Sequence, residues 1–289
     1  MDEVEVVGLH WTVSGPVQVE NGRNWSLFDF RDRCAAAQRV GFAGIGIWHA
    51  DLGHVLERRT LREVKQILDD HGLTRIELEF LKDWFLDLSD ERRTASDATR
   101  RFLFEAAGVL GAHHIKVGNT PGTPCSPELL TERFAELCAD AAQEHDSLIA
   151  YEFMPFDLNV HSVEAAVAVV GGAGAPNGVI ALDTWHLAKL EITPSDVRSI
   201  PADLLGWVEL SDGQRQNLPD LLDEAINHRR LPGEGEFDVA GYVGACRDVG
   251  YRGPWGVEVL SEDLRNLPMH EIFEKAYTTT AAQLKVGAA

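Results

Sequence analysis

Hydrophobic runs of strand length alternate with amphipathic stretches of helical spacing from one end of the chain to the other. The strand-like runs are Val4–Thr12, Gly44–His49, Arg75–Leu81, His114–Gly118, Leu148–Met154, Gly178–Thr184, Gly206–Ser211 and Trp255–Leu260. The helix-like stretches between them include Leu27–Val40, Leu61–His71, Glu91–Leu110, Pro127–His145, Ser162–Val170, Val239–Val249 and Met269–Leu284. Eight such units predict an α/β fold, a single (β/α)8 TIM barrel that spans residues 1–289 as one domain.

An open, doubly wound sheet would show the same alternation, so the turn after the first strand helps to decide between the two folds. Such a sheet usually carries a glycine-rich phosphate turn, G-x-G-x-x-G, at that point. Here the first predicted strand ends in G-L-H-W-T. The sequence therefore favours the closed barrel.

Four acidic residues, which we call the strand-end carboxylates, lie at or near the carboxyl ends of the last four predicted strands: Glu152, Asp183, Glu209 and Glu258. Residues two positions apart in a strand share a face. The residues that share a face with these acids are Leu148, Ala150, Val179, Ala181, Trp207 and Gly256. The alternate positions are apolar and suit packing against outer helices. Strand parity therefore predicts that all four carboxylates point into the barrel.

Four negative charges that converge on one end of a barrel would repel each other unless they were protonated or shared a cation. A single acid at a strand end is more often a loop cap or the partner of an ion pair. Four in one pattern instead predict a metal site, because buried charges are expected to be paired or to coordinate a cation. An all-oxygen ligand set favours Mg²⁺ or Mn²⁺, with Co²⁺ as a substitute, over Zn²⁺.

Four further polar residues near the same end of the predicted barrel are candidate substrate contacts: His186, Arg215, Lys116 and His49. His186 follows Asp183 by three residues, at the strand-to-loop edge where barrel active sites are built. Arg215, in S-D-G-Q-R-Q, could hold a hydroxyl or carboxylate of a ligand. Each also has an ordinary structural interpretation, because a histidine can be a core residue, a lysine a packing or rim residue, and a loop arginine solvated.

Composition narrows the classes of partner and location. The formal net charge of −20 argues against nucleic acid, which requires a basic surface. No run reaches the roughly eighteen apolar residues of a membrane span. The chain starts M-D-E-V-E-V-V, acidic where a secretory signal would be basic, so a cytoplasmic protein is expected. The four cysteines form no C-x-x-C pair, which indicates reduced packing thiols.

At these motifs the chain resembles the xylose isomerase-like TIM-barrel superfamily of sugar and sugar-phosphate isomerases and epimerases. The resemblance covers nearly the whole chain and rests on Y-E-F, L-D-T-W-H, V-E-L-S-D-G, R-L-P-G-E-G-E-F-D and the final G-V-E-V. It implies one divalent cation, Mn²⁺ or Mg²⁺, bound by the four strand-end carboxylates. It also implies that His186 and Arg215 contact the substrate.

One position departs from the pattern of the superfamily. Many members have a histidine where this chain has Glu209, and some, including bacterial 3-dehydroshikimate dehydratases of this fold, have a glutamine. A glutamate can ligate in its place. Its extra negative charge would raise the affinity for hard cations and weaken the electrophilic pull on a substrate oxygen.

The resemblance implies a metal-dependent isomerase or epimerase of a sugar or cyclitol. The metal would chelate a carbonyl and an adjacent hydroxyl and stabilise an enediolate, while Glu152 and Glu258 remove and return the proton. A dehydratase of a keto-sugar, an inosose or 3-dehydroshikimate is the first alternative, with His186 as the acid for the leaving hydroxyl. A non-catalytic sugar-binding subunit is the second, and the intact acids count against it.

The sequence says less about the substrate. It shows no glycine-rich or basic phosphate cradle, which favours a small-molecule polyol, ketose or carbocyclic acid over a sugar phosphate. The tryptophans near the predicted rim could stack on a ring or belong to the core: Trp11, Trp48, Trp84 and Trp185. Barrels of this kind often pair through helices or rim loops, so the class allows a homo-oligomer.

Overall fold

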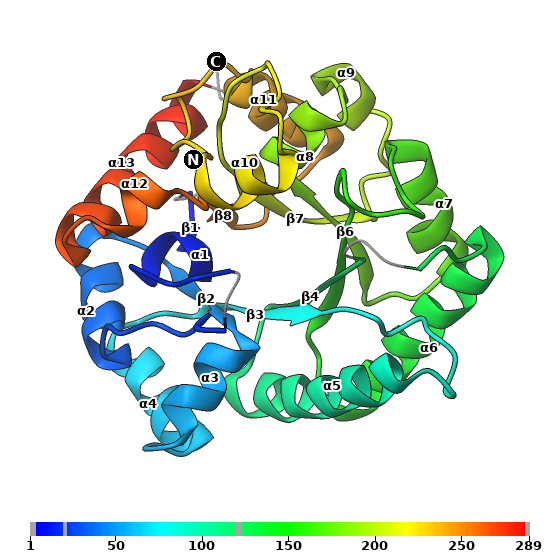
Figure 1. Cartoon of the computed structure of the whole chain (residues 1–289), viewed down its shortest axis with the longest axis horizontal. Coiled ribbons are helices and arrows are strands. Elements are labelled where there is room, and N and C mark those ends of the chain that lie inside the picture. The colour runs from blue at the N-terminus through cyan, green and yellow to red at the C-terminus, as the bar shows by residue number, and fades with distance from the viewer. Residues whose placement is uncertain (1–3, 20–21, 120–122, 287–289) are drawn as a thin grey trace.

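Eight parallel strands close into a barrel in which each strand pairs with its neighbours in chain order and β1 pairs with β8. The computed structural model describes residues 4–19, 22–119 and 123–286. Figure 1 places the strands around the centre and the helices outside them. The strands are β1 (Val6–Gly8), β2 (Gly44–Trp48), β3 (Arg75–Leu81), β4 (His114–Gly118), β5 (Leu148–Glu152), β6 (Gly178–Asp183), β7 (Leu205–Leu210) and β8 (Trp255–Val257). The predicted (β/α)8 barrel is confirmed.

Long helices cover the outside of the barrel. All seven predicted helices are present, as α2 (Phe30–Val40), α4 (Leu61–Asp70), α5 (Glu91–Leu110), α6 (Pro127–Glu144), α7 (Val163–Ala173), α11 (Val239–Val249) and α13 (Met269–Val286). The pattern did not predict the short helices α1 (His10–Val13), α3 (His49–Leu56), α8 (Thr184–Lys189), α9 (Pro194–Val197), α10 (Leu221–Asn227) and α12 (Glu262–Arg265). All of these except α9 are the first helix after a strand, so they lie at the end of the barrel where the strand-end carboxylates converge.

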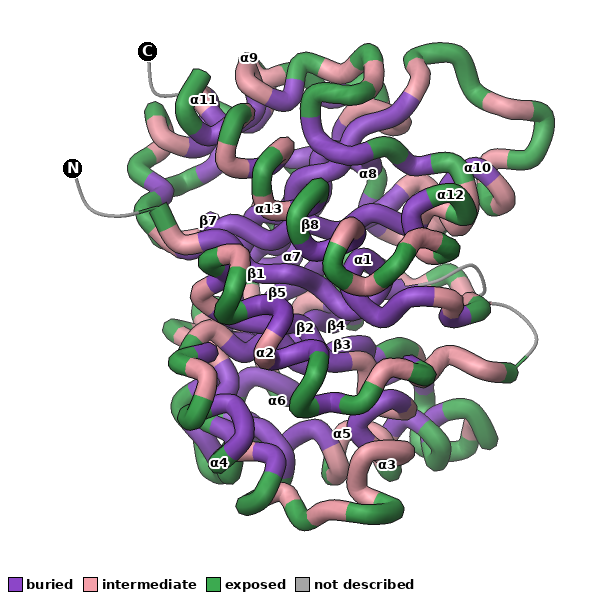
Figure 2. Tube along the Cα trace, turned by 90° about the vertical axis from the view of Figure 1, so that its left-hand side faces the viewer, coloured by how far each residue is buried: buried purple, intermediate pink, exposed green. Residues whose placement is uncertain are grey.

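The strands divide the core into an inner and an outer layer. Figure 2 shows that the trace is buried along the strands and exposed mainly at the outer helices and loops. The inner cluster consists of Val7, Leu9, Ala150, Val179, Ala181 and Trp207. The alternate strand positions, such as Ile149 and Leu182, belong to the larger cluster packed against the helices. The predicted parity of the strands is therefore confirmed.

The first strand is shorter than its pattern predicted, because the backbone turns into helix α1 after Leu9. The Thr12 side chain replaces strand pairing there. Its Oγ1 donates to the carbonyl oxygen of Val257 at 2.8 Å and accepts from the N–H of Val259 at 2.7 Å. A short apolar run fits a buried helix as well as a buried strand, so periodicity could not separate the two.

A buried polar network fixes the segment between α1 and α2. Arg33 donates to Asp51 at 2.7 Å and to Ser14 Oγ at 3.1 Å. His10 lies beside them, with Nδ1 2.9 Å from Ser14 Oγ and Nε2 3.0 Å from the carbonyl oxygen of Asn24. These contacts fit a neutral imidazole that carries its proton on Nε2. Burial is the main cause that lowers the pKa of His10 to about 4, with a further contribution from Arg33.

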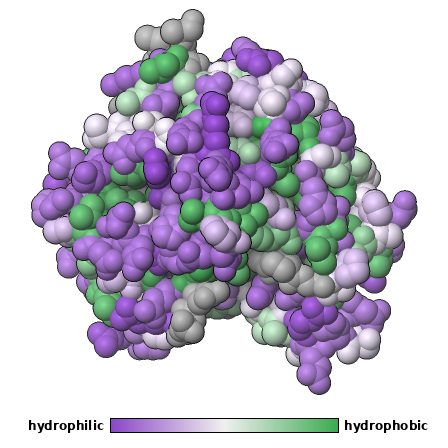
Figure 3. Space-filling model, turned by 45° about the horizontal axis from the view of Figure 1, so that its top comes forward, coloured by the Kyte–Doolittle hydropathy of each residue, from purple (hydrophilic) through white to green (hydrophobic). Residues whose placement is uncertain are grey.

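The outer surface is mostly polar. Figure 3 shows hydrophilic residues over most of the visible face, with hydrophobic residues scattered between them. Within the described ranges, no helix is both long enough and apolar enough to span a bilayer.

The network predicts a pH-dependent loss of stability. Because His10 has a pKa of about 4 when folded and about 6.5 when unfolded, the unfolded chain takes up the proton first as the pH falls. Between pH 7.5 and 5 the free energy of unfolding of the wild type should fall by about 2 kcal/mol more than that of His10→Gln. Urea unfolding at both pH values, in EDTA, measures this difference. Parallel pH profiles of the two proteins would show that His10 is not held neutral.

Candidate active site

The strand-end carboxylates meet at one end of the barrel interior. Parallel pairing places Asp183 directly beside Glu209. Glu152 ends β5, and Glu258 follows β8 by one residue, with its N–H bonded to the carbonyl oxygen of Leu210 at 3.1 Å. All four are buried, and one carboxylate oxygen from each lies within 4.8 Å of the others. The structure therefore brings together the complete predicted set.

A buried lysine lies among these acids. Lys116 Nζ is 2.9 and 3.0 Å from the two oxygens of Glu209, 2.7 Å from Glu258 and 3.1 Å from Glu79. Burial alone would lower its pKa, but Glu152 and the other surrounding carboxylates raise the pKa of Lys116 well above its usual value. Lys116 therefore stays charged and offsets part of the negative charge.

Arg229 is the second buried cation among these acids, and the sequence pattern did not predict it. Its guanidinium is 2.6 Å from Asp183 and 3.4 Å from Glu258. Burial would raise the pKa of Asp183, but Arg229 and then His186 lower it to about 2. The neighbouring Arg230 exchanges two backbone hydrogen bonds of 2.8 Å with Asp212, which fixes this stretch against the end of β7. The only sequence signal was its position just ahead of the P-G-E-G motif, because it lies on no regular strand or helix.

Three hydrogen bonds fix the carboxylate of Glu209. Trp207 Nε1 donates to its Oε1 at 2.7 Å, in addition to the two contacts from Lys116. Gly256, opposite Glu209 on β8, makes room for this indole, because a Cβ there would lie 3.0 Å from Trp207 Cζ2. Burial and the nearby charge of Glu258 raise the pKa of Glu209 well above its usual value.

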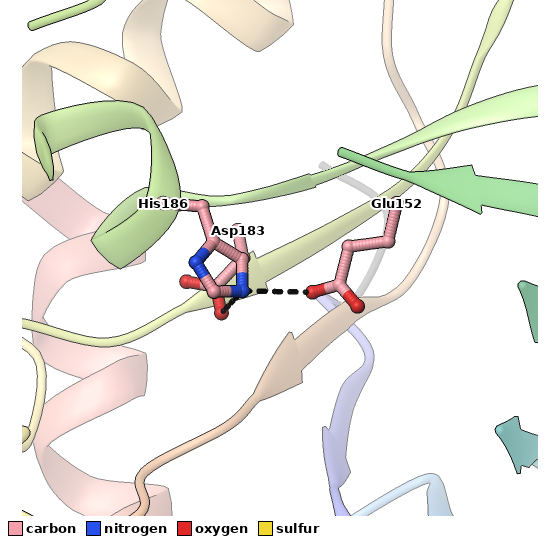
Figure 4. A group of neighbouring side chains, drawn as sticks. All are labelled: Glu152, Asp183 and His186. Carbon is pink, nitrogen blue, oxygen red and sulfur yellow. Dashed lines mark ion pairs between the residues drawn. The ribbon is translucent and has the colours of Figure 1, made fainter. Parts of the chain in front are cut away.

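His186 lies between two of the acids, as Figure 4 shows. Its Nε2 is 3.4 Å from Glu152 Oε1 and 3.7 Å from Asp183 Oδ2. Helix α8 positions it, because Asp183 accepts the backbone N–H of Trp185 at 2.7 Å and so caps the helix directly after β6. The D-x-x-H spacing thus places the His186 imidazole next to Asp183, the residue that caps helix α8.

The donor set fits a hard divalent cation. Oxygen atoms of four carboxylates converge, and Glu152 Oε1 is buried without a hydrogen-bond partner among the described residues. A buried carboxylate oxygen with a free lone pair is a position that a cation would satisfy. His186 could supply a nitrogen together with Glu152 and Asp183. The residues therefore fit Mg²⁺ or Mn²⁺ by their chemistry and also leave room for a nitrogen ligand.

A cavity of about 180 Å³ adjoins the acids. Glu152, Glu258, Lys116, Arg229 and His186 line it, whereas Asp183 and Glu209 do not. Two of the strand-end carboxylates can therefore reach a bound molecule, and the other two lie behind them.

Two predicted substrate contacts are not brought to this cavity. Arg215 is exposed, and its Nε donates to the carbonyl oxygen of Glu236 at 3.0 Å, because the loop after β7 folds against the P-G-E-G loop. His49 begins helix α3 rather than ending β2, and its Nδ1 accepts the N–H of Phe80 at 3.3 Å. Neither residue lines this cavity, because its polar atoms make loop and backbone contacts, and direct contact of Arg215 and His49 with a substrate stays a prediction. Lys116 and His186 are in the cavity wall as predicted.

Comparison with known proteins agrees with this fold. The family model of the xylose isomerase-like TIM barrel matches residues 34–281. The chain belongs to this family. One solved structure with a similar fold is an IOLI protein with a bound zinc atom. It aligns with a TM-score of 0.82 at 17% identity, over 97% of this chain and 98% of that chain.

The curated relatives of this xylose isomerase-like protein are named for different reactions. It is 26% identical over 241 residues to the 3-dehydroshikimate dehydratase of Pseudomonas putida. The aligned region covers 83% of this chain and 37% of that protein. It is 23% identical over 268 residues to the inosose isomerase of Bacillus velezensis, covering 78% of this chain and 93% of that protein. The chain thus spans little more than a third of the length of the first relative. Its relatives include a dehydratase and an isomerase.

Lys116→Met is expected to lower the free energy of unfolding in EDTA by about 3–5 kcal/mol, because Glu209 and Glu258 lose a buried counter-charge. Mn²⁺ should restore more stability to this variant than to the wild type, since the cation replaces part of the missing charge. Urea unfolding with EDTA and with Mn²⁺ measures both effects.

Lys189→Met provides a matched control. Lys189 is another buried lysine, 2.5 Å from Glu224 and bonded to the carbonyl oxygen of Gln214. This variant should lose stability with no change in its response to Mn²⁺. An equal response to Mn²⁺ in the two variants would contradict the role of Lys116 as a counter-charge of the carboxylate cluster.

Proposed function

We propose that this protein is a divalent-metal-dependent isomerase or epimerase of a small hydroxylated carbonyl compound. One observation carries the proposal: Glu152 and Glu258 reach the cavity from β5 and from the residue after β8, with β6 and β7 between them. Two carboxylates that approach a bound molecule from different sides can move a proton between two positions on it.

Glu152, Asp183, Glu209 and Glu258 would hold the cation, and His186 would contact the substrate. The cation would act as a Lewis acid toward a carbonyl oxygen and so acidify the neighbouring C–H bond. Mn²⁺ or Mg²⁺ suits the oxygen donors. The bound zinc of the IOLI structure supports a metal ion in a barrel of this fold.

The chain's own residues supply the proton transfer. In the proposed reaction, an oxygen of Glu152 or Glu258 accepts the proton from the carbon next to the carbonyl. A proton delivered by the other carboxylate to the opposite face of the same carbon gives an epimer. A proton delivered to the carbonyl carbon, with the neighbouring hydroxyl proton passing to the former carbonyl oxygen, gives an aldose–ketose isomer. Lys116 and Arg229 hold Glu258 from two sides, at 2.7 and 3.4 Å, and so keep it oriented toward the cavity.

A dehydratase is the second candidate, and the position of His186 favours it. After the same proton removal, a hydroxyl on the next carbon could leave as water with a proton from His186. The imidazole lies 3.4 Å from Glu152 and lines the cavity, so one molecule can contact both. The similarity to 3-dehydroshikimate dehydratase supports this candidate, and the similarity to inosose isomerase supports the first.

Glu258→Gln tests the proposal. The purified wild type is expected to hold one Mn²⁺ or Mg²⁺ per chain and to exchange a substrate C–H with solvent in D₂O. The variant should lose most of the bound metal and reduce the exchange rate by at least about 100-fold, because it removes a ligand and a base together. Elemental analysis measures the metal. NMR with a panel of ketoses, inososes and 3-dehydroshikimate measures exchange, and the product separates epimerisation from dehydration.

Glu132→Gln is the control, because Glu132 is exposed on α6 and the substitution makes the same change of charge. It should retain both metal and exchange. The proposal fails if the wild type binds no divalent cation after supplementation, or if Glu258→Gln exchanges its substrate at the wild-type rate.

A further inference from the structure

Lys116 lies among more carboxylates than its ammonium can serve at once. An ammonium has three N–H groups. Its nitrogen contacts five acidic side chains, at 2.7 Å to Glu258, 2.9 Å to Glu209, 3.1 Å to Glu79, 3.5 Å to Glu77 and 3.9 Å to Glu152. The two shortest contacts are with Glu209 and Glu258, which are two of the strand-end carboxylates.

A divalent cation held by the strand-end carboxylates would compete with this ammonium. Both oxygens of Glu209 accept hydrogen bonds from Lys116, at 2.9 and 3.0 Å. A cation such as Mg²⁺ binds its oxygen ligands at about 2.1 Å, and two positive charges that share the same oxygens in a buried site repel each other. Glu209 can therefore bind the cation well only if the ammonium gives up part of this contact.

Glu77 offers the ammonium a second position deeper in the barrel. It lies on β3 two residues before Glu79, and it pairs in register with His114, two residues before Lys116 on β4. Its Oε2 is 3.0 Å from His114 Nε2, which fixes the carboxylate. Its Oε1 is buried 3.5 Å from Lys116 Nζ, without a hydrogen-bond partner among the described residues. A shift of roughly 0.5 Å would turn this contact into a hydrogen bond.

Glu77 suits this role better than Glu79 does. Glu77 is fully buried and does not line the cavity, whereas Glu79 lines it. Burial would raise the pKa of Glu77, but Lys116 and then His114 lower it below its usual value. Burial is the main cause that raises the pKa of Glu79 well above its usual value. Glu77 is therefore the stable anion on the inner side of the ammonium.

We infer that Glu77 receives the Lys116 ammonium when a divalent cation binds to the strand-end carboxylates, and that Glu77 thereby sets the affinity for a metal it does not touch. This inference rests on the metal site of the proposed function. The movement changes hydrogen-bond partners only, and the ammonium stays paired with a carboxylate throughout. Glu77 and Lys116 are then positioning residues of the metal site.

Crystal structures of the full chain grown in EDTA and with Mn²⁺ test the movement directly. With Mn²⁺ bound, Lys116 Nζ should lie within about 3.2 Å of Glu77 Oε1 and no longer contact both oxygens of Glu209. An ammonium that keeps both Glu209 contacts beside the bound cation would overturn the inference. A second Mn²⁺ bound by Glu77 would also overturn it, because Glu77 would then be a ligand.

Glu77→Gln tests the same claim in solution. It should raise the Kd for Mn²⁺ at least about tenfold, because the displaced ammonium no longer finds an anion. In the Lys116→Met background the same substitution should raise the Kd by no more than about threefold, because no ammonium has to move. Electron paramagnetic resonance of free Mn²⁺ measures the Kd of all four proteins. Equal factors in the two backgrounds would assign the effect to the charge of Glu77 alone and contradict the movement.

Glu224→Gln is the matched control. Glu224 is a buried acid that is paired with Lys189 and does not line the cavity. The control should lose stability in urea and keep the wild-type Kd for Mn²⁺. A loss of affinity as large as that of Glu77→Gln would point to general destabilisation and overturn the inference. The comparison of crystal structures needs no substitution, so it decides the question even if Glu77→Gln does not fold.

The outcomes separate this inference from the proposed function. A protein that binds Mn²⁺ and catalyses exchange while Lys116 keeps its contacts with Glu209 contradicts only the movement. A protein in which Lys116 moves to Glu77 on binding Mn²⁺, but which exchanges no substrate proton, contradicts only the proposed reaction. A wild type that binds no divalent cation contradicts both.

Discussion

The crowding of carboxylates inside the barrel is the constraint on which the rest of the site depends. Two buried cations, Lys116 and Arg229, lie among these acids and contact Glu258 from different strands and loops. Buried charges without partners would destabilise the fold by several kcal/mol each. The two basic side chains therefore make the cluster compatible with folding. A divalent cation would complete the compensation on the side of Glu152, where an oxygen has no hydrogen-bond partner among the described residues.

The strands and the segments that follow them contribute different side chains to the site. The strands place the acids by parity and register, which are rigid features of a closed sheet. The segments after the strands then supply further side chains of the cavity wall: His186 from α8, and Arg229 from the stretch that pairs with Asp212. Such a division is typical of barrels, in which the strands provide stability and the loops at their carboxyl ends provide function.

The barrel and the four acids could be predicted from the sequence because both follow from periodicity. Arg229 and the contacts of Lys116 could not, since they depend on which loops meet across the barrel. Glu209 illustrates the limit well. Its position as a strand-end acid was predictable, but its three hydrogen bonds from Lys116 and Trp207 arise from residues on two different strands. Arg215 and His49 are absent from the cavity wall for the same reason, because local loop and helix geometry turns their polar atoms to backbone partners.

Glu209 stands where the resemblance to the superfamily implies a histidine in many members. If all four strand-end carboxylates hold the cation, its protein ligands are oxygen atoms, and His186 serves the substrate instead. Pulsed electron paramagnetic resonance of the full chain loaded with one equivalent of Mn²⁺ tests this claim most directly. The account predicts a single tight site without the coupling of a directly bonded imidazole nitrogen. A strong nitrogen coupling, or Mn²⁺ that remains free in solution, would contradict it.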